Sequence, residues 1–315
     1  MNPYVFIVGC PRSGTTLLRR MVDAHPDIAV IDETHWITHL YERRRGVTAD
    51  GLATPEILEH LRGDRRFARL ELPWPAVERV LDGARDYAAF VSGVFDQYGA
   101  LHGKRLVGDK TPGYIRKIPT LRRLWPNARF VHLIRDGRDV ALSVAAWKKS
   151  DRLFAEYRSW PDDPWTTAAL WWERSLRLGR EAAAALPPGS YREMRYEALV
   201  SDPQGECRAL CGFLGLEFDP AMLRFHEGRT RRHPRYTTKQ QWLPPTGGLR
   251  DWRTQMPAEV LESFESAAGD LLDELGYPRG ARPPAPSMRE RANAARRVFC
   301  EDVLARQRPL PEGWA

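Results

Sequence analysis

The expected fold class follows from residues 4–33, which read YVFIVGCPRSGTTLLRRMVDAHPDIAVIDE. The first five, Tyr4 to Val8, are apolar and mostly β-branched or aromatic, and this pattern predicts a buried strand. A tight loop runs from Gly9 to Thr16, and apolar residues then recur at helical spacing until Pro26. A strand, a glycine loop and a helix start in this order aim backbone N–H groups at one point, which attracts phosphate.

The loop departs from the usual phosphate-binding loop of nucleoside triphosphatases. Gly9 and Gly14 keep the G-x4-G spacing of a Walker A motif, but Thr15 stands where that motif has lysine. The only strong cation inside the loop is Arg12. An arginine followed by Ser-Gly-Thr-Thr, directly after a buried strand, still favours phosphate binding over a plain turn.

PRSGTTLL, residues 11–18, resembles the 5′-phosphosulfate loop of sulfotransferases that use 3′-phosphoadenosine-5′-phosphosulfate (PAPS). In pattern it is most similar to the tyrosylprotein sulfotransferases and their bacterial relatives, which share the loop arginine and the downstream run DAHPDIAVIDET. The resemblance extends over roughly residues 4–275 and implies an α/β fold with a central parallel sheet flanked by helices, as in P-loop nucleotide-binding proteins. It also implies that PAPS is the cofactor and is bound by Pro11, Arg12, Ser13, Gly14, Thr15 and Thr16.

A second short strand is expected over residues 27–33, and it ends in Asp32 and Glu33. In the tyrosylprotein enzymes the proposed catalytic base follows the loop arginine by 21 positions, and Glu33 follows Arg12 by the same distance. The chemistry needs such a group, because an acceptor hydroxyl must lose its proton as it attacks sulfur. Glu33 is therefore the preferred base, and the neighbours Asp32 and His35 remain alternatives.

Leu106 to Gly108 predict a third strand, and Asp109 to Pro112 predict a turn after it. A lone lysine in a turn is usually solvated, so the residues alone give Lys110 no function. The resemblance implies one, because a Lys-x-Pro that lies 25 residues before Arg135 matches the family's pattern. Lys110 would bind the bridging and sulfonate oxygens while charge builds on the leaving phosphate.

Another buried strand is expected at Arg129 to Ile134, and Arg135 follows it. The run HLIRDGRDVALS resembles the family's 3′-phosphate segment, in which an arginine at a strand end and a serine eight positions later clamp the 3′-phosphate of PAPS. Arg135 and Ser143 fit this spacing. Arginine offers a planar fork for phosphate, and a hydroxyl on the following helix adds a donor. Arg138 and Asp139 are expected to form a local ion pair.

Two later segments complete the expected nucleotide site. A last core strand ends just before YEAL, which resembles a turn whose tyrosine contacts adenine in the family, and this implies a nucleotide contact for Tyr196. A basic loop between Phe225 and Trp252 resembles the segment that closes over the nucleotide and carries a cation. The family has lysine before the tryptophan, where this chain has Asp251, so either Arg250 or Arg253 is expected to substitute.

Composition and length set the remaining expectations. The 315 residues are 43% hydrophobic, which predicts one α/β domain over residues 1–277, with a Pro-rich linker and a basic helix in residues 278–315. Neither a secretory signal pattern nor an apolar run of about 18 residues is present, so a cytoplasmic protein without a membrane span is expected. Of the four cysteines only Cys207 and Cys211 are close, and their spacing predicts one helix face rather than a metal site.

The resemblance implies transfer of a sulfuryl group from PAPS to an acceptor hydroxyl, with Arg12, Glu33 and Lys110 as catalytic residues. The acceptor stays open among a small molecule, a phenolic or sugar hydroxyl and a peptide tyrosine, and a homodimer is one option for assembly. Two other function classes fit parts of the sequence. A P-loop kinase or NTPase would need the missing lysine after Gly14. A non-catalytic nucleic-acid-binding protein would suit the net charge of +7, but the cations cluster at the two phosphate segments and in one loop, so no nucleic-acid partner is expected.

Overall fold

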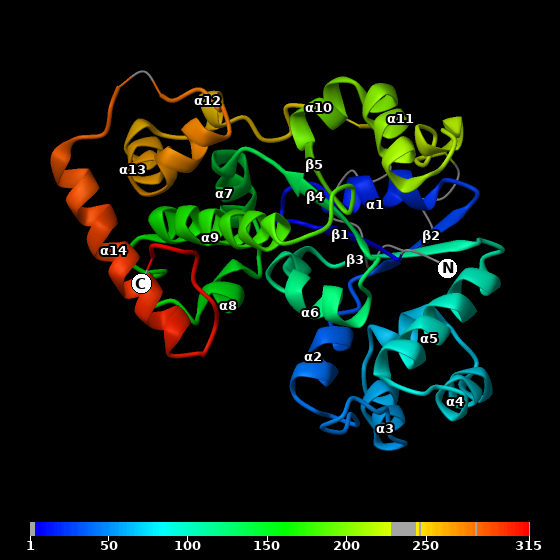
Figure 1. Ribbon diagram of the computed structural model, residues 1–315. Coiled ribbons are helices and arrows are strands. Elements are labelled where there is room, and N and C mark those ends of the chain that lie inside the picture. The colour runs from blue at the N-terminus through cyan, green and yellow to red at the C-terminus, as the bar shows by residue number, and fades with distance from the viewer. Residues whose placement is uncertain (1–3, 228–243, 246, 281, 315) are drawn as a thin grey trace.

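The computed structural model describes residues 4–227, 244–245, 247–280 and 282–314. Within these residues, five parallel strands form one sheet in the order β2-β3-β1-β4-β5 at the centre of the molecule (Figure 1). The strands are β1 (Val5–Val8), β2 (Ile28–Asp32), β3 (Leu106–Lys110), β4 (Arg129–Ile134) and β5 (Tyr191–Arg195). The predicted α/β fold with a central parallel sheet flanked by helices is confirmed.

Strand β1 shows why the sequence folds in this way. Successive side chains of a strand point to opposite faces of a sheet. Phe6 and Val8 pack into the hydrophobic cluster on one face, while Val5 and Ile7 pack into the cluster on the other. An unbroken apolar run is therefore what a strand covered on both faces requires.

Strand β3 is longer than the sequence predicted. Asp109 and Lys110 were expected in a turn, but they are paired in the sheet with Phe6 and Ile7 of β1 and with Ile31 and Asp32 of β2. The neighbouring strands on both sides extend the ladder past Gly108, and this long-range pairing overrides the polar character of the two residues. Lys110 is thus held by a strand end rather than by a turn.

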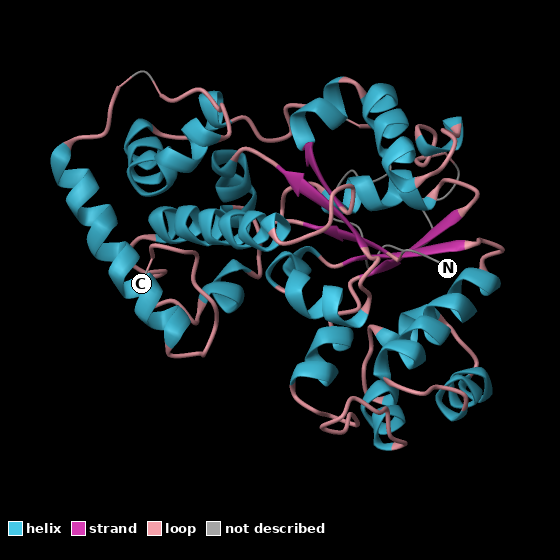
Figure 2. Cartoon of the chain, viewed as in Figure 1, coloured by secondary structure: helices cyan, strands magenta, loops and turns pink. Residues whose placement is uncertain are grey.

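Helices cover both faces of the sheet, and a further group of helices packs beside it (Figures 1 and 2). One face carries α1 (Thr15–Asp23), α10 (Tyr196–Ser201) and α11 (Pro203–Leu214), followed by the 3₁₀ helix η3 (Pro220–Met222). The YEAL segment was predicted to be a turn, but it forms α10, because Tyr196 and Leu199 are buried against this face and Pro203 starts the next helix. Cys207 and Cys211 are both buried on α11, as their spacing predicted.

The opposite face is covered by the first half of the chain after β2. These elements are α2 (Trp36–Glu42), α3 (Glu56–Arg62), η1 (Phe67–Leu70), α4 (Trp74–Asp82), α5 (Tyr87–Leu101), η2 (Pro112–Arg116) and α6 (Ile118–Leu124). Together with Tyr4, Phe6 and Val8 they form the largest hydrophobic cluster among the described residues.

The last group of helices surrounds the long helix α9. It consists of α7 (Gly137–Ala145), α8 (Ser150–Phe154), α9 (Pro164–Ala184), α12 (Trp252–Gln255), α13 (Ala258–Glu274) and α14 (Pro286–Leu304). The basic helix α14 is packed rather than fully solvated, because the Phe299 ring stacks on Tyr157 with centroids 4.6 Å apart and Arg296 pairs with Glu173 at 2.7 Å. The division at residues 277–278 stays a prediction.

The ends of the parallel strands explain where a site can form. All five strands run in one direction, so their carboxyl ends meet at one edge of the sheet. Arg12, Glu33, Lys110, Arg135 and Tyr196 each lie at or just beyond the end of a different strand. Open α/β sheets bind ligands at this edge, where the strand order reverses.

Candidate active site

The loop between β1 and α1 has an unusual backbone. Gly9 and Gly14 have φ values of 153° and 93°, and Arg12, which carries a side chain, has a φ of 77°. This left-handed conformation costs a non-glycine residue about 1–2 kcal/mol, so the surrounding structure must hold Arg12 in place. Thr15 and Thr16 begin α1, and the N–H groups of a first helical turn lack partners inside the helix and attract anions.

Tyr196 closes one side of this loop. A Cβ atom on Gly14 would lie 2.4 Å from Cδ2 of the Tyr196 ring, so only glycine permits the contact. The guanidinium carbon of Arg135 lies 4.3 Å from the centroid of the same ring, which is a cation–π contact. The structure therefore brings Gly14, Tyr196 and Arg135 together, while the predicted contact of Tyr196 with adenine stays a prediction.

Arg12 lies at the centre of a group of positive charges. Its Nε donates a hydrogen bond of 3.1 Å to Ser143 Oγ, and its guanidinium carbon lies 5.4 Å from the centroid of the Trp147 ring. Burial lowers the pKa of Arg12, and the charges of Arg250 and Arg135 lower it further. The guanidinium groups of Arg250 and Arg135 both act on that of Arg12, and such a concentration of positive charge favours an anion.

Two buried donors in this group are orphaned. Ser13 Oγ and Arg135 Nε have no hydrogen-bond partner among the described residues, although Ser13 is fully buried and Arg135 nearly so. Buried polar atoms in folded proteins are almost always paired. Unpaired donors beside a helix N-terminus and clustered arginines fit the phosphate oxygens of a nucleotide such as PAPS.

Lys110 links the loop to the carboxylates at the end of β2. Its Nζ lies 2.6 Å from Asp32 Oδ1 and 2.9 Å from Glu33 Oε1, and it contacts Thr16 Oγ1 at 3.5 Å. With 1% of its surface exposed, Lys110 is not the solvated lysine that its residue pattern alone suggested. The extension of β3 accounts for the difference, since it carries Lys110 to the edge of the sheet where α1 begins.

Glu33 is held as a carboxylate. Its Oε2 lies 3.6 Å from His35 Nε2. Burial acts to raise the pKa of Glu33, but the contact with His35 and the charge of Lys110 outweigh burial and hold the pKa below its ordinary value. Glu33 is therefore ionised at neutral pH, as a proton acceptor must be. Asp32 and His35, the alternative bases, adjoin the same cluster, so the choice among the three stays a prediction.

Asp139 is a site neighbour that the sequence analysis missed. Its Oδ2 lies 3.3 Å from Arg135 Nη2, and its Oδ1 accepts a hydrogen bond of 3.0 Å from the N–H of Trp252. Burial raises the pKa of Asp139 to about 6 despite the nearby arginine. Asp139 thereby joins the arginine of the predicted 3′-phosphate site to the start of α12. The four-residue spacing from Arg135 was the available signal.

The predicted ion pair between Arg138 and Asp139 is wrong. Arg138 is fully buried, and its Nε and Nη2 bind the two carboxylate oxygens of Asp136 at 3.0 and 2.7 Å. Its Nη1 donates a 2.7 Å hydrogen bond to Glu265 of α13. The fork geometry of arginine favours this bidentate partner over the adjacent residue, and the network ties the turn after β4 to the C-terminal helices.

The structure separates the two candidate arginines near Trp252. The charge of Arg250 acts on Arg12, whereas Arg253 pairs with Asp251 at 3.7 Å and lies over the Trp252 ring. Asp251 accepts the N–H of Arg253 and caps α12, which explains a carboxylate at this position. Arg250 is thus brought to the site and Arg253 is not. Residues 228–243, most of the predicted basic loop, lie outside the described residues.

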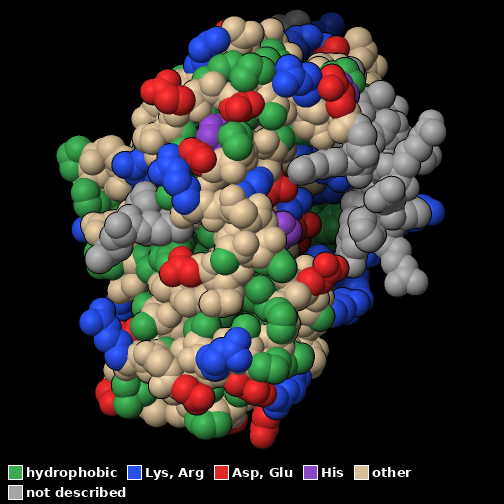
Figure 3. Space-filling view, turned by 90° about the vertical axis from the view of Figure 1, so that its right-hand side faces the viewer, with side chains coloured by type: hydrophobic (Ala, Val, Ile, Leu, Met, Phe, Trp, Pro, Cys, Tyr) green, Lys and Arg blue, Asp and Glu red, His purple; other side chains and the backbone are tan. Residues whose placement is uncertain are grey.

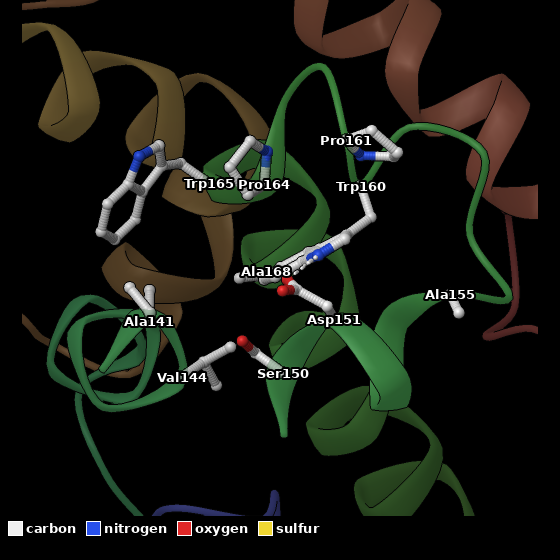
Figure 4. Close-up of a pocket in the computed structure, with 11 residues that line it drawn as sticks. Ala141, Val144, Ser150, Asp151, Ala155, Trp160, Pro161, Pro164, Trp165 and Ala168 are labelled. Carbon is white, nitrogen blue, oxygen red and sulfur yellow. Dashed lines mark hydrogen bonds between the residues drawn. The ribbon is translucent and has the colours of Figure 1, made fainter. Parts of the chain in front are cut away.

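A cavity of about 590 Å³ is lined by residues of α7, α8 and α9 (Figure 4). Its walls are mostly apolar and are formed by Ala141, Val144, Ala145, Ser150, Asp151, Ala155, Trp160, Pro161, Pro164, Trp165 and Ala168. None of the predicted site residues lines it. At 100° per residue, Ala141 and Ala145 lie on the face of α7 opposite Ser143, so these two cavity residues point away from the hydroxyl that binds Arg12.

The surface in Figure 3 shows basic and acidic side chains interspersed over this face of the molecule. Among the described residues, no group of three or more His, Cys, Asp and Glu is placed to hold a metal ion. In the same part of the chain, none of the helices combines the length and apolarity needed to cross a bilayer.

Known proteins resemble this chain over most of its length. Protein-tyrosine sulfotransferase 2 of Gallus gallus is 29% identical over 292 residues, which cover 90% of this chain and 71% of the relative. Among solved structures, a sulfotransferase domain from the curacin biosynthetic pathway aligns over 99% of both chains with a TM-score of 0.53 and 19% identity. A sulfotransferase domain from the olefin synthase of Synechococcus PCC 7002 aligns over 98% of this chain and 96% of that one, with a TM-score of 0.51 and 21% identity. These two structures share the fold.

The strongest assignment comes from a protein-family model. The model, described as the sulfotransferase family, matches residues 3–220, which is more than half of the chain and includes every strand of the sheet. The matched region carries the loop, Lys110, Glu33, Arg135 and Tyr196, and leaves α12 to α14 outside. This chain therefore belongs to the sulfotransferase family and is a sulfotransferase enzyme.

Proposed function

We propose that this sulfotransferase moves a sulfuryl group from PAPS to an acceptor hydroxyl, with Glu33 as the base. One observation carries the proposal: at the carboxyl edge of the sheet, orphaned donors on the loop (Ser13) and after β4 (Arg135) accompany a lysine that is paired with a carboxylate at 2.9 Å. The site thus combines groups that bind anionic oxygens with a group that accepts a proton. Bound PAPS would supply the sulfuryl group.

Glu33 would accept the proton of the attacking hydroxyl. As the new bond between the acceptor oxygen and sulfur forms, the bond between sulfur and the bridging phosphate oxygen breaks. The electron pair of that bond stays on the phosphate, so the products are a sulfate ester and 3′-phosphoadenosine-5′-phosphate (PAP). An ionised and partly exposed Glu33 carboxylate, with 38% of its side chain accessible, suits this task.

Lys110 and Arg12 would stabilise the charge that develops on the leaving oxygen. Both are fixed before any ligand arrives, Lys110 by its carboxylates and Arg12 by Ser143, so little reorganisation is needed. An anion that binds Lys110 would compete with the Glu33 carboxylate for the Nζ of Lys110. Such competition would raise the pKa of Glu33 and make it a stronger base.

Arg135, Ser143, Tyr196 and Arg250 would hold the nucleotide. Arg135 has a buried Nε without a described partner, which supports a role as donor to a phosphate. Tyr196 offers a ring beside the loop, although its present partner is Arg135. Arg250 supports the proposal through its charge near Arg12, whereas Arg253 is paired outside the group.

The acceptor class is proposed only as a hydroxyl: that of a small molecule, a phenol or sugar, or a peptide tyrosine. The name of the chicken relative states protein tyrosine as its acceptor, and this supports testing peptides first. The cytoplasmic location and the homodimer stay predictions. Because the chain belongs to the sulfotransferase family, neither the kinase nor the nucleic-acid-binding alternative is proposed.

The test is transfer of radiolabelled sulfate from PAPS to a panel of tyrosine peptides, phenols, sugars and aliphatic alcohols. Arg12→Ala should abolish transfer and weaken PAP binding, because it removes the central cation of the loop. Arg253→Ala, at an exposed arginine that pairs outside the site, is the matched control and should retain transfer. Near-normal turnover of Arg12→Ala would remove Arg12 from the proposed mechanism.

A further inference from the structure

The segment that carries Glu33 has a strained backbone. Glu33 has a φ of 56° and His35 a φ of 43°, although neither is glycine. Each left-handed residue of this kind is unfavourable, so the surrounding contacts must fix the segment. Thr34 stands between these two residues, so the contacts that hold Thr34 help to determine where the Glu33 carboxylate lies.

The peptide groups on both sides of Glu33 are pinned to consecutive residues of β3. The N–H of Glu33 donates to the carbonyl oxygen of Lys110 at 2.9 Å and extends the sheet by one bond. The N–H of Thr34 donates to Oδ2 of Asp109 at 3.2 Å. A side chain thus takes over where the backbone ladder ends. Thr34 Oγ1 also shares a hydrogen bond of 2.9 Å with the Tyr114 hydroxyl.

Asp109 is well suited to this task. None of its surface is exposed, and it lies in a strand with neighbours on both sides, so its position is rigid. Side chains alternate along a strand, so Lys110 reaches the Glu33 carboxylate while Asp109 reaches the backbone that follows it. A buried carboxylate is costly unless it is hydrogen-bonded, and the backbone N–H of Thr34 supplies such a bond.

We propose that Asp109 is a positioning residue that fixes Glu33 in its left-handed conformation beside Lys110. The inference rests on the proposed function, since it assumes that Glu33 is the base. Asp109 touches no reacting atom in this scheme. Its effect is on the placement of the carboxylate, where a displacement of about 1 Å can cost on the order of 10² in rate.

The experiment compares Asp109→Leu, which is similar in size but cannot accept a hydrogen bond, with Asp109→Asn, which can. Asp109→Leu should lower kcat by about 10- to 100-fold and leave the Kd for PAP within about threefold, because the loop and Arg135 are untouched. Asp109→Asn should recover most of kcat. Tyr114→Phe is the matched control, since it removes the other hydrogen bond of Thr34 but keeps the backbone bond.

A second measurement separates positioning from a general structural role. If Glu33 leaves Lys110 and His35, its pKa rises, so the acid limb of the kcat/KM profile should move to higher pH in Asp109→Leu. Should that variant fail to fold, Asp109→Ser, whose hydroxyl is too short to reach Thr34, is measured in the same way. Wild-type kcat, or a parallel loss of kcat and PAP affinity without a shift of the acid limb, would overturn the inference.

A Glu33 variant tests the assignment of the base separately from the role of Asp109. Glu33→Gln is measured beside the Asp109 variants. If Glu33→Gln is inactive and Asp109→Leu is fully active, only the role of Asp109 is rejected. If Glu33→Gln keeps wild-type turnover, the base assignment itself is wrong and the inference falls with it.

Discussion

Glu33 has the properties of a base that is ready before the acceptor arrives. Lys110 binds its Oε1 and His35 approaches its Oε2, so the carboxylate is both oriented and ionised. The same Lys110 is 2.6 Å from Asp32, which gives the cluster two carboxylates for one ammonium group. Removal of one carboxylate should therefore leave Lys110 partnered, and the two can be compared directly.

Glu33→Gln should lower kcat by a factor on the order of 10² to 10⁴ while PAP affinity is retained, because the amide keeps the shape but cannot take a proton. Asp32→Asn is the control, since it also removes a partner of Lys110 but is not the preferred base. Steady-state rates and calorimetric PAP titrations measure the two effects. A larger loss in Asp32→Asn than in Glu33→Gln would move the base to Asp32.

The pH dependence of activity should reflect the depressed pKa of Glu33. Burial opposes the depression, while the contact with His35 and the charge of Lys110 produce it. His35→Gln removes a lowering contribution, so the pKa of Glu33 should rise and the acid limb of kcat/KM should shift to higher pH. His39→Gln, at an exposed histidine of α2, should leave the limb in place. An unshifted limb in His35→Gln would show that this contact does not set the titration.

The pKa of Asp109 is raised, whereas that of Glu33 is lowered, and this raised pKa predicts how stability depends on pH. Burial raises its pKa to about 6, above the ordinary value of 3.8, so its folded form prefers the proton. The stabilisation is complete below about pH 4 and is lost as the pH rises through about 6. For a shift of about two pKa units, this contribution of Asp109 to the unfolding free energy is up to about 3 kcal/mol, and Asp109→Asn removes it. On going from pH 4 to pH 7, the unfolding free energy of Asp109→Asn should therefore fall less, or rise more, than that of the wild type, and urea denaturation at both pH values measures this change. The same change in both proteins would contradict the raised pKa.

At the scale of elements, the loop before α1 depends on close contact as well as on backbone conformation. Gly14→Ala places a Cβ 2.4 Å from the Tyr196 ring, whereas Gly51→Ala meets no atom within 4 Å although Gly51 has nearly the same φ, 90° against 93°. Gly51→Ala should cost about 1–2 kcal/mol from backbone strain. Gly14→Ala should cost more and should also weaken PAP binding. Equal losses of melting temperature and no change in PAP affinity would mean that the Tyr196 contact has no role in the loop.

The strands and several site residues were predictable from sequence because their signals are local. Buried strands appear as apolar runs; Arg135 directly follows one of them, and Arg12 lies in the short loop after another. The partners of Asp109 and Asp139 were not predictable in this way, because Thr34 is 75 positions from Asp109 and Trp252 is 113 positions from Asp139. Lys110 was predicted in a turn from its local sequence, but pairing with β2 makes it part of β3.

At the scale of the whole molecule, the C-terminal helices support the nucleotide side of the site. Arg138, in the first turn of α7, is bound to Asp136 and to Glu265 of α13, with both Arg138 and Glu265 buried. The N–H of Gly280 donates to the same Glu265 carboxylate at 2.9 Å. The segment beyond the family match therefore stabilises the turn that carries Arg135.

Glu265→Leu should destabilise the fold by on the order of 3 kcal/mol, because it leaves the buried Arg138 with one carboxylate instead of two. Glu274 lies on the same helix, and its ion pair with Arg177 is partly exposed. Glu274→Leu should therefore cost less than about 1 kcal/mol. Urea denaturation measures both. Similar costs would show that the buried network does not support the fold.

Calorimetric titration measures whether the carboxyl edge of the sheet binds a bisphosphorylated adenosine nucleotide. The wild-type chain is titrated with PAP, with 5′-AMP and with ATP plus magnesium. We expect selective binding of PAP, and we expect Arg135→Ala to lose more affinity for PAP than for 5′-AMP. A preference for ATP with magnesium, or an equal loss for PAP and 5′-AMP in Arg135→Ala, would contradict this expectation.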